Sequence, residues 1–243
     1  MSAAIDLNAD LGELPWPAGR ALDARVLAHV TSASVACGGH AGDADTMRAT
    51  FAAARAAGVR AGAHPSYPDR EGFGRRTIAM NAEALGEVIA DQVAAAREAA
   101  EAEGVTLGYL KAHGALYHDA SAEPIASVVA ACAQAHGLDL IGPPRGMLLR
   151  AARERGLRYL AEGFADRAYE DGEIVPRSRP GAVIEDTVVQ AAQAVRLARG
   201  EVWPGGPPPV ATICLHGDTP GAAEAAGRIR AAIEAAGIVV RAP

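Results

Sequence analysis

The feature of this sequence that most constrains its fold is a repeated alternation between short apolar segments and longer, Ala-rich segments of helical periodicity. The short segments are typical of strands buried on both faces of a sheet. In the segments between them apolar residues recur every three or four positions, for example at Leu85, Ile89 and Val93, which indicates amphipathic helices. The expected strands are, in chain order, Ala3–Asn8, Ser32–Ala36, Arg60–His64, Thr106–Ala112, Leu138–Ile141, Arg158–Glu162, Val210–Leu215 and Ile238–Arg241.

Repeated βα units fold into a parallel sheet that is either open or closed into a barrel. Seven or eight strands with a helix after nearly every one favour an α/β fold of the distorted (β/α) TIM-like barrel type. A doubly wound open sheet is the alternative. The glycines that follow the helical segments suit a left-handed helix end, which supports this division. They are Gly58, Gly104, Gly137, Gly156, Gly200 and Gly237.

Length and composition limit the domain number, the location and the partners. We expect a single domain over residues 1–243, an ordinary size for an α/β barrel. A net charge of −6 argues against a surface for nucleic acid or anionic membranes, since both need concentrated positive charge. The three cysteines form no disulfide framework, and no segment resembles a signal peptide or a transmembrane helix. We therefore expect a cytoplasmic protein, and whether it forms a homo-oligomer is left open.

Lys111 is the only lysine among 23 basic side chains, all others being arginine. A lysine kept against this bias indicates a place that needs a compact ammonium rather than a guanidinium group. His113 lies two residues further on, so both side chains point the same way if the segment is extended. Gly114 then allows a sharp turn or a close approach of the backbone.

In βα folds the active site lies at the carboxyl ends of the strands. Ionisable or amide side chains stand at or just past the ends of six of the expected strands. They are Asn8 and Asp10, His40, His64, Lys111 and His113, Glu162 with Asp166 and Arg167, and His216 with Asp218. Because a rim used only for stability has no need to collect imidazoles, this placement predicts a functional site.

A divalent metal is one expectation for this rim. Asp10, His40 and His64 come from three neighbouring strands, and carboxylate with imidazole suits zinc or a similar ion. A nucleotide-binding P-loop is excluded, because the Gly-x-x-x-x-Gly-Lys-[Ser/Thr] pattern does not occur.

Two expected loops are longer than usual βα connections and carry arginines. Pro65–Asn81 contains Arg75 and Arg76, and Gly163–Ala182 contains Arg167. Loops of this length in compact domains are often lids or binding loops, and guanidinium groups suit a carboxylate or a phosphate.

Taken together, the motifs resemble those of the LamB/YcsF family over nearly the whole chain and in the family's order. The matching motifs are Asp6-Leu-Asn-Ala-Asp-Leu-Gly-Glu13, Ser34-Val-Ala-Cys-Gly-Gly-His-Ala-Gly-Asp43, Gly62-Ala-His-Pro-Ser-Tyr-Pro-Asp69, Gly72-Phe-Gly-Arg-Arg76, Lys111-Ala-His-Gly-Ala-Leu-Tyr117, Glu162-Gly-Phe-Ala-Asp-Arg-Ala-Tyr169, Val175-Pro-Arg177 and Cys214-Leu-His-Gly-Asp218. Ala9 stands where the family often has Cys, which argues against a cysteine nucleophile there, and Ala112 stands where it usually has Pro.

The resemblance implies a barrel-like fold related to the glycoside hydrolase/deacetylase superfamily. It also implies an ATP-dependent 5-oxoprolinase, which cleaves the lactam of 5-oxo-L-proline to L-glutamate while ATP is hydrolysed to ADP and phosphate. The resemblance further implies a complex with two further subunits, B and C, with which ATP and Mg would be handled jointly.

On this basis we assign catalysis to Asp10, His64, Lys111 and His113. We assign substrate binding to Asn8, His40, Arg75, Arg76, Glu162, Asp166, Arg167, His216 and Asp218. In this hypothesis an arginine holds the substrate carboxylate, Lys111 stabilises oxyanion or phosphate charge, and Asp10, His64 or His113 deprotonates water. Replacing Lys111 by alanine is expected to abolish turnover and to leave the fold intact.

Two alternatives stay open. The first is a stand-alone metal-dependent amide hydrolase of the deacetylase type, which needs a metal and no ATP. The second is a non-catalytic scaffold that docks partners, for which substitutions at the rim would be harmless.

Overall fold

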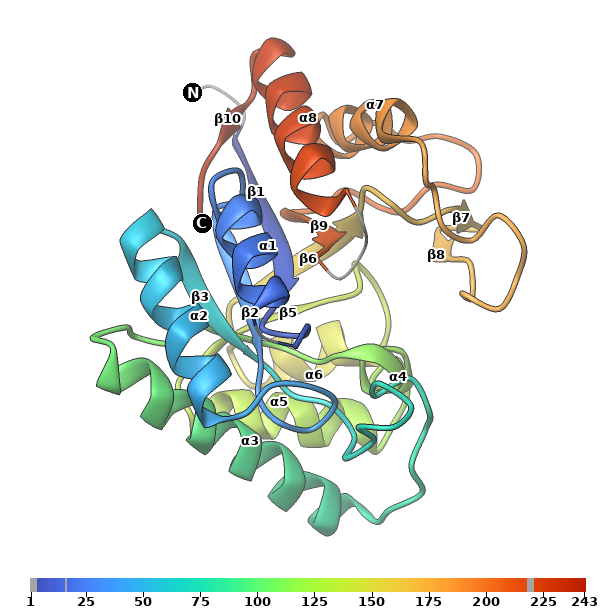
Figure 1. Ribbon diagram of the computed structural model, residues 1–243. Helices are drawn as coiled ribbons and strands as arrows, with labels where there is room; N and C mark the ends of the chain where they lie inside the picture. Colours follow the sequence, from blue (N-terminus) through green and yellow to red (C-terminus); the bar gives the residue numbers. More distant parts are fainter. Residues whose placement is uncertain (1–3, 16, 218–220) are drawn as a thin grey trace.

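The computed structural model describes residues 4–15, 17–217 and 221–243, and its centre is a closed barrel of seven parallel strands (Figure 1). The barrel strands are β1 (Ala4–Leu11), β2 (Ser32–Ala36), β3 (Arg60–His64), β4 (Tyr109–Lys111), β5 (Asp139–Gly142), β6 (Tyr159–Phe164) and β9 (Thr212–His216). They pair in this order, and β9 returns to β1 in a register from Asp6 opposite Thr212 to Asp10 opposite His216. The predicted TIM-like barrel is therefore confirmed, and the open sheet is wrong.

Helices cover the outside of the barrel (Figure 1). They are α1 (Ala18–Leu27), α2 (Ala44–Ala57), α3 (Ala82–Ala102), α4 (Gly114–Asp119), α5 (Ile125–Ala135), α6 (Met147–Glu154), α7 (Thr187–Ala198) and α8 (Ala222–Ala235). The main apolar core lies between the helices and the outward-facing strand residues, such as Leu7 and Leu11 of β1 with Phe51 of α2. Within the described residues no helix has the length and apolar character needed to cross a membrane.

The inside of the barrel is largely polar. Along β1 every second side chain points inward, so Asp6, Asn8 and Asp10 form a column of buried polar groups. Asp6 accepts hydrogen bonds from the hydroxyls of Ser32 and Thr212, at 2.7 and 2.6 Å. These bonds connect β1 with both of its neighbours in the barrel.

A small apolar cluster of Tyr109, Ile141 and Leu160 fills the opposite side of the barrel interior. The Tyr109 ring lies against Gly62 of β3, where a Cβ atom would come within 2.4 Å of the ring. Glycine at this position therefore makes room for the Tyr109 ring, and the hydroxyl of Tyr109 reaches Ser34 at 3.2 Å.

The strand bounds agree with the predictions at β2 and β3 and differ elsewhere. β1 continues to Leu11, because its last residues pair with both β2 and β9. Asn8 and Asp10 therefore lie within β1 rather than after it, and Glu162 likewise lies within β6. The predicted strand Thr106–Ala112 is paired only over Tyr109–Lys111. The predicted eighth strand is β10 (Val239–Val240), which pairs with the start of β1 and takes no part in closing the barrel.

The two long loops differ in structure. The segment between β3 and α3 contains turns, and Asn81 at its end accepts a hydrogen bond from the Ala84 amide and so caps α3. The segment after β6 folds into a hairpin of β7 (Tyr169–Glu170) and β8 (Glu173–Ile174). Its two legs also meet at an antiparallel bridge between Arg167 and Val183.

Candidate functional site

A cavity of about 490 Å³ opens at the carboxyl ends of the barrel strands. Its floor includes Asp10 of β1, His64 of β3, Lys111 of β4, His113 directly after β4, and His216 of β9. The structure thus brings all four predicted catalytic residues to one cavity. A smaller cavity of about 150 Å³ adjoins it and shares Tyr117, His118, Phe164 and Ile174 with it.

Lys111 is at the centre of the floor, and its side chain is only 2% exposed. Its ammonium lies 2.8 Å from Asp10 Oδ1 and 2.8 Å from Glu162 Oε1. It also donates to Asn8 Oδ1 at 3.0 Å and lies 3.1 Å from Cys214 Sγ. An arginine fork would not fit this compact arrangement, which explains the single lysine of the sequence.

Asp10 and Lys111 stabilise each other's charged forms. Burial raises the pKa of Asp10, but the neighbouring imidazole of His64 and the ammonium of Lys111 outweigh it and hold this pKa well below its ordinary value. Burial lowers the pKa of Lys111, but Asp10 and Glu162 raise it well above the ordinary value. Both groups are therefore charged at neutral pH.

The imidazoles of His64 and His113 meet at a short distance. His64 Nδ1 lies 2.8 Å from the carbonyl oxygen of Lys111, and His113 Nε2 lies 2.9 Å from the carbonyl oxygen of Phe73. Carbonyls only accept hydrogen bonds, so these two nitrogens carry the hydrogens. His64 Nε2 and His113 Nδ1 are then bare lone pairs 3.0 Å apart, an arrangement that requires a shared proton or a cation.

This arrangement depends on the close approach of two loops. Phe73 has a left-handed backbone with a φ of 55°, which turns its carbonyl toward His113. Gly114 also has a positive φ of 58°, and a Cβ atom there would lie 2.4 Å from the carbonyl oxygen of Gly74. The predicted close approach at Gly114 is therefore present.

Glu13 and His40 complete a group of four buried donors with His64 and His113, whose ligand atoms all lie within 4.8 Å of one another. Glu13 Oε1 lies 3.0 Å from His40 Nε2, 3.3 Å from His113 Nδ1 and 3.9 Å from His64 Nε2. A tetrahedral ion with bonds of about 2.1 Å places its ligands roughly 3.4 Å apart. The donor set and its spacing therefore fit a divalent metal such as zinc.

The protonation of this group agrees with a metal site. Burial raises the pKa of Glu13, but its contacts with the imidazoles of His113 and His40 lower it far below its ordinary value. Burial lowers the pKa of His40 to about 4, against the opposing effect of Glu13, so this imidazole is neutral. An ionised carboxylate and a neutral imidazole are the forms that bind metals.

On the opposite side of the floor, His216 is oriented by Asp166. His216 Nδ1 lies 2.7 Å from Asp166 Oδ2, and the His216 amide donates to the same oxygen at 3.2 Å. Burial lowers the pKa of His216, but the carboxylate of Asp166 raises it above the ordinary value. The other ring nitrogen has no hydrogen-bond partner among the described residues and is available to a ligand in the cavity.

The arginines differ in their placement. Arg75 and Arg167 line the cavity, as does Arg177, which was not assigned to the site from the sequence. Arg76 does not line it, because its guanidinium binds Asp69 in the same loop.

Four other predicted binding residues support the site rather than face the main cavity. The side-chain amide of Asn8 donates hydrogen bonds to Glu162 and Thr212. Glu162 forms an ion pair with Lys111, and Asp166 orients His216. His40 belongs to the four-donor group. Asp218 lies outside the described residues, so its assignment stays a prediction.

Sequence reasoning missed Glu13 as a metal donor. It named Asp10 with His40 and His64, whereas Asp10 lies beside the group, 3.4 Å from His64 Nε2, and is held by Lys111. The available signal was the position of Glu13 two residues past β1, after Gly12, whose φ of 73° turns the chain back toward the rim.

Comparisons with known proteins agree with this architecture. The model of the LamB/YcsF family matches residues 5–243. The 5-oxoprolinase A subunit of Methylococcus capsulatus is 46% identical over 253 residues, covering 100% of this chain and 96% of that protein. The lactam utilization protein from Thermus thermophilus has a crystal structure with a TM-score of 0.89 at 36% identity, covering 99% of this chain and 100% of that one.

A more distant structure shares the fold alone. The catalytic domain of the peptidoglycan N-acetylglucosamine deacetylase from Eubacterium rectale has a TM-score of 0.52 at 14% identity, covering 100% of this chain and 90% of that one. It shows that this barrel fold also occurs in a deacetylase. With a family match over nearly the whole chain and close relatives of full length, this chain belongs to the LamB/YcsF family.

Proposed function

We propose that this chain is the A subunit of an ATP-dependent 5-oxoprolinase and cleaves the lactam of 5-oxo-L-proline to L-glutamate together with subunits B and C. Full-length 5-oxoprolinase A subunits of other bacteria are 43% to 47% identical to it. The main structural support is the convergence of Asp10, Lys111, His113 and His216 on one cavity. The cytoplasmic location, the single domain and any homo-oligomer stay predictions.

The cavity holds the groups that hydrolysis of an amide requires. Water must lose a proton as its oxygen attacks the carbonyl carbon, and the ring nitrogen must gain a proton as the C–N bond breaks. Asp10, ionised and on the floor, is placed to accept the first proton. His216, with a raised pKa and a free ring nitrogen, is placed to give the second. Two groups whose pKa values are pushed apart suit these opposite roles.

Lys111 supplies a fixed positive charge beside the reaction. Its ammonium is held by Asp10 and Glu162 before any ligand binds, so it can stabilise charge that develops on the carbonyl oxygen without reorganisation. An unstrained lactam is a poor electrophile, and transfer of a phosphoryl group from ATP to its carbonyl oxygen would activate it. ATP with Mg would be handled jointly with the partner subunits, because this chain has no P-loop.

A divalent metal is part of this proposal. Glu13, His40, His64 and His113 would hold it, and when bound it would polarise the carbonyl as a Lewis acid. His64 Nε2 and His113 Nδ1 lie 3.0 Å apart with their lone pairs facing each other, which suits a bound cation. This pair therefore also favours a second candidate function, a metal-dependent amide hydrolase that acts without ATP.

The experiment that tests both candidates measures glutamate and ADP formation from 5-oxo-L-proline, first with this chain alone and then with subunits B and C. We expect turnover only in the complete mixture and only with ATP. Cleavage of the lactam by the isolated chain without ATP, lost on chelation, would replace the proposal by the second candidate. If neither the chain nor the mixture cleaves the lactam, both are wrong.

Metal content gives a readout that does not depend on activity. We expect about one equivalent of zinc or a similar ion in the purified wild-type chain loaded with metal, and loss of this ion in His113→Gln. His118→Gln is the matched control, because His118 lines the same cavity but lies outside the four-donor group. Equal metal content in H113Q and wild type would exclude the proposed ligands.

A further inference from the structure

Arg167 is a buried cation without a carboxylate partner among the described residues. It is 3% exposed, and its guanidinium donates to the carbonyl oxygens of Val175 at 2.6 Å and Ala182 at 3.3 Å. These bonds tie the two legs of the segment between β6 and α7 together. Neutral carbonyls do not cancel the charge, and a buried charge without a counter-ion is costly.

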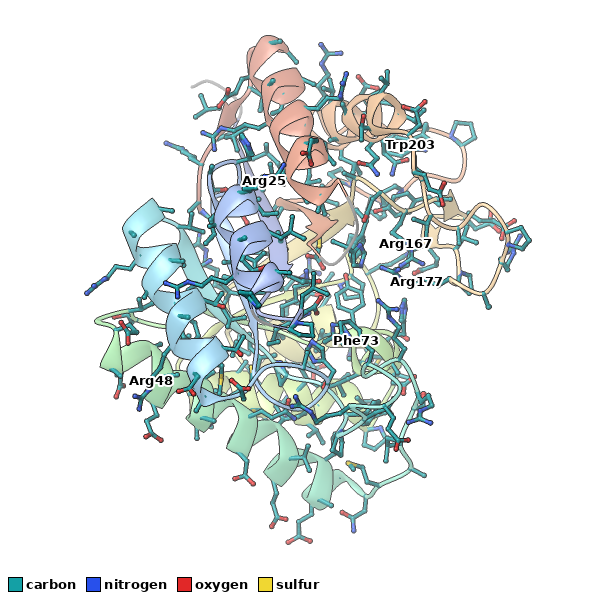
Figure 2. The ribbon with its side chains drawn as sticks, viewed as in Figure 1. Arg25, Arg48, Phe73, Arg167, Arg177 and Trp203 are labelled. Atoms are coloured by element: carbon teal, nitrogen blue, oxygen red, sulfur yellow. The ribbon has the colours of Figure 1, made fainter. Side chains whose placement is uncertain are left out.

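Arg177 brings a second positive charge to the same place. It comes from the same segment, is exposed to solvent, and lines the same cavity as Arg167. Burial and the charge of Arg177 both lower the pKa of Arg167. Figure 2 shows the two arginines next to each other on the side of the barrel where Phe73 also lies. No ion pair of Arg177 with any described carboxylate exists in the structure.

The neighbouring arginines of this region are neutralised. Arg179, two residues after Arg177, is paired with Glu170 of β7, and Arg145 is paired with Glu173 of β8 at 2.7 Å. The hairpin therefore supplies a carboxylate to each of these outer arginines and none to Arg167 or Arg177. The two remaining charges face the cavity, where a ligand can neutralise them.

We propose that Arg167 and Arg177 form an anion subsite at the mouth of the cavity, which binds a carboxylate or phosphoryl group of the ligand. Two guanidinium groups offer planar donor pairs that match the oxygens of such anions. The assignment of the ligand rests on the proposed function: 5-oxo-L-proline carries one carboxylate, and its activation by ATP adds a phosphoryl group. The subsite would hold this anion while the lactam carbonyl faces Lys111 on the floor.

The test compares Arg177→Gln with Arg179→Gln in the full chain by calorimetry. Arg177 is exposed, so its replacement leaves the buried loop bonds of Arg167 in place. Arg179 is the matched control, since it is exposed, lies on the same segment and does not line the cavity. The probes are 5-oxo-L-proline, the uncharged lactam 2-pyrrolidinone, and inorganic phosphate.

We expect R177Q to weaken anion binding by about 10-fold or more, as loss of a charge-assisted hydrogen bond typically does. R179Q should bind like the wild type, and added salt should weaken the wild type more than R177Q. A loss for 5-oxo-L-proline but not for 2-pyrrolidinone identifies the carboxylate as the anion. A loss for phosphate alone identifies a phosphoryl group.

Unchanged binding of both anions by R177Q would overturn the subsite, as would failure of the wild type to bind either anion. The same loss in R179Q, or an equal loss for 2-pyrrolidinone, would also overturn it, because the effect would then not depend on the anion. The subsite and the proposed function fail separately. If phosphate binding depends on Arg177 while the complete enzyme mixture leaves 5-oxo-L-proline intact, the subsite stands and the substrate is wrong.

Discussion

At the scale of single residues, Lys111 shows how one side chain serves both the fold and the site. Its ammonium joins Asp10, Glu162 and Asn8 inside the barrel, and it also lines the cavity. The unusual lysine was visible in the sequence, but its complete burial was not. This burial changes the expectation for its removal.

Replacing Lys111 by alanine should abolish turnover and also lower the free energy of unfolding by about 3–5 kcal/mol, because it leaves two buried carboxylates without their cation. The intact fold expected from the sequence is thus revised to a weakened one. Urea unfolding and the coupled activity assay measure the two effects. Unchanged activity would remove Lys111 from the mechanism, and an unchanged urea midpoint would show that its ion pairs do not stabilise the barrel.

Replacing Asp166 by asparagine should lower the pKa of His216. The carboxylate favours the imidazolium form and raises this pKa in the wild type, while burial opposes it. Without the carboxylate the burial effect dominates, so the imidazolium is lost at a lower pH. NMR titration of the His216 ring measures the shift, and the alkaline limb of the pH-rate profile should move in the same direction. An identical titration in both proteins would contradict the role of Asp166.

At the scale of helices and strands, helix α1 is attached to the end of β1 through one buried carboxylate. Asp23 accepts a hydrogen bond from the Gly12 amide at 2.9 Å. Burial raises the pKa of Asp23 from 3.8 to about 6, although the hydrogen bond opposes this shift. The folded chain therefore keeps a proton on Asp23 that the unfolded chain loses between about pH 4 and 6, so the free energy of unfolding falls over this range.

Replacing Asp23 by asparagine should remove this loss of stability at higher pH, because asparagine does not ionise. Its side-chain oxygen can still accept the hydrogen bond from the Gly12 amide. We expect the variant to be more stable than the wild type by roughly 3 kcal/mol at pH 7 and equally stable near pH 3.5. Urea unfolding at the two pH values is the measurement. A variant that is less stable than the wild type at pH 7 would show that the charged form of Asp23 is favoured.

The element positions could largely be predicted from local signals. β2 and β3 have the predicted bounds, and the six glycines named at helix ends all have positive φ angles, between 63° and 80°. The predictions failed where pairing with distant strands set the ends. β1 runs to Leu11 because β2 and β9 both pair with it. β4 is short because only Tyr109–Lys111 of the predicted strand pair with β5, and only Leu110 pairs with β3.

At the scale of the whole molecule, the return of β9 to β1 closes the barrel and completes the site (Figure 1). Thr212 is the polar link at this closure. Its hydroxyl donates to Asp6 at 2.6 Å and accepts from the Asn8 amide at 2.7 Å, and the residue is fully buried. Asn8 in turn supports Lys111, so the closure is connected to the cavity floor.

Replacing Thr212 by valine should lower the free energy of unfolding by about 2–3 kcal/mol, because it keeps the shape and leaves buried polar groups unsatisfied. Thr77→Val is the matched control: Thr77 donates to Asp119 in the same way but is exposed, so its loss should cost less than about 0.5 kcal/mol. Equal urea midpoints for T212V and T77V would show that the closure does not depend on this link.

The sequence by itself determined the alternation of strands and helices and the set of strand ends that carry the polar groups, and it favoured a barrel over an open sheet. It could do so because hydrophobic periodicity and glycine helix ends are encoded by residues near one another in the chain. Only the tertiary structure decided that Glu13 joins three histidines, that Asn8 and Glu162 support Lys111, and that Arg177 faces the cavity. These contacts depend on where a loop returns and which way a side chain points, and both are set by packing against segments far away in the sequence.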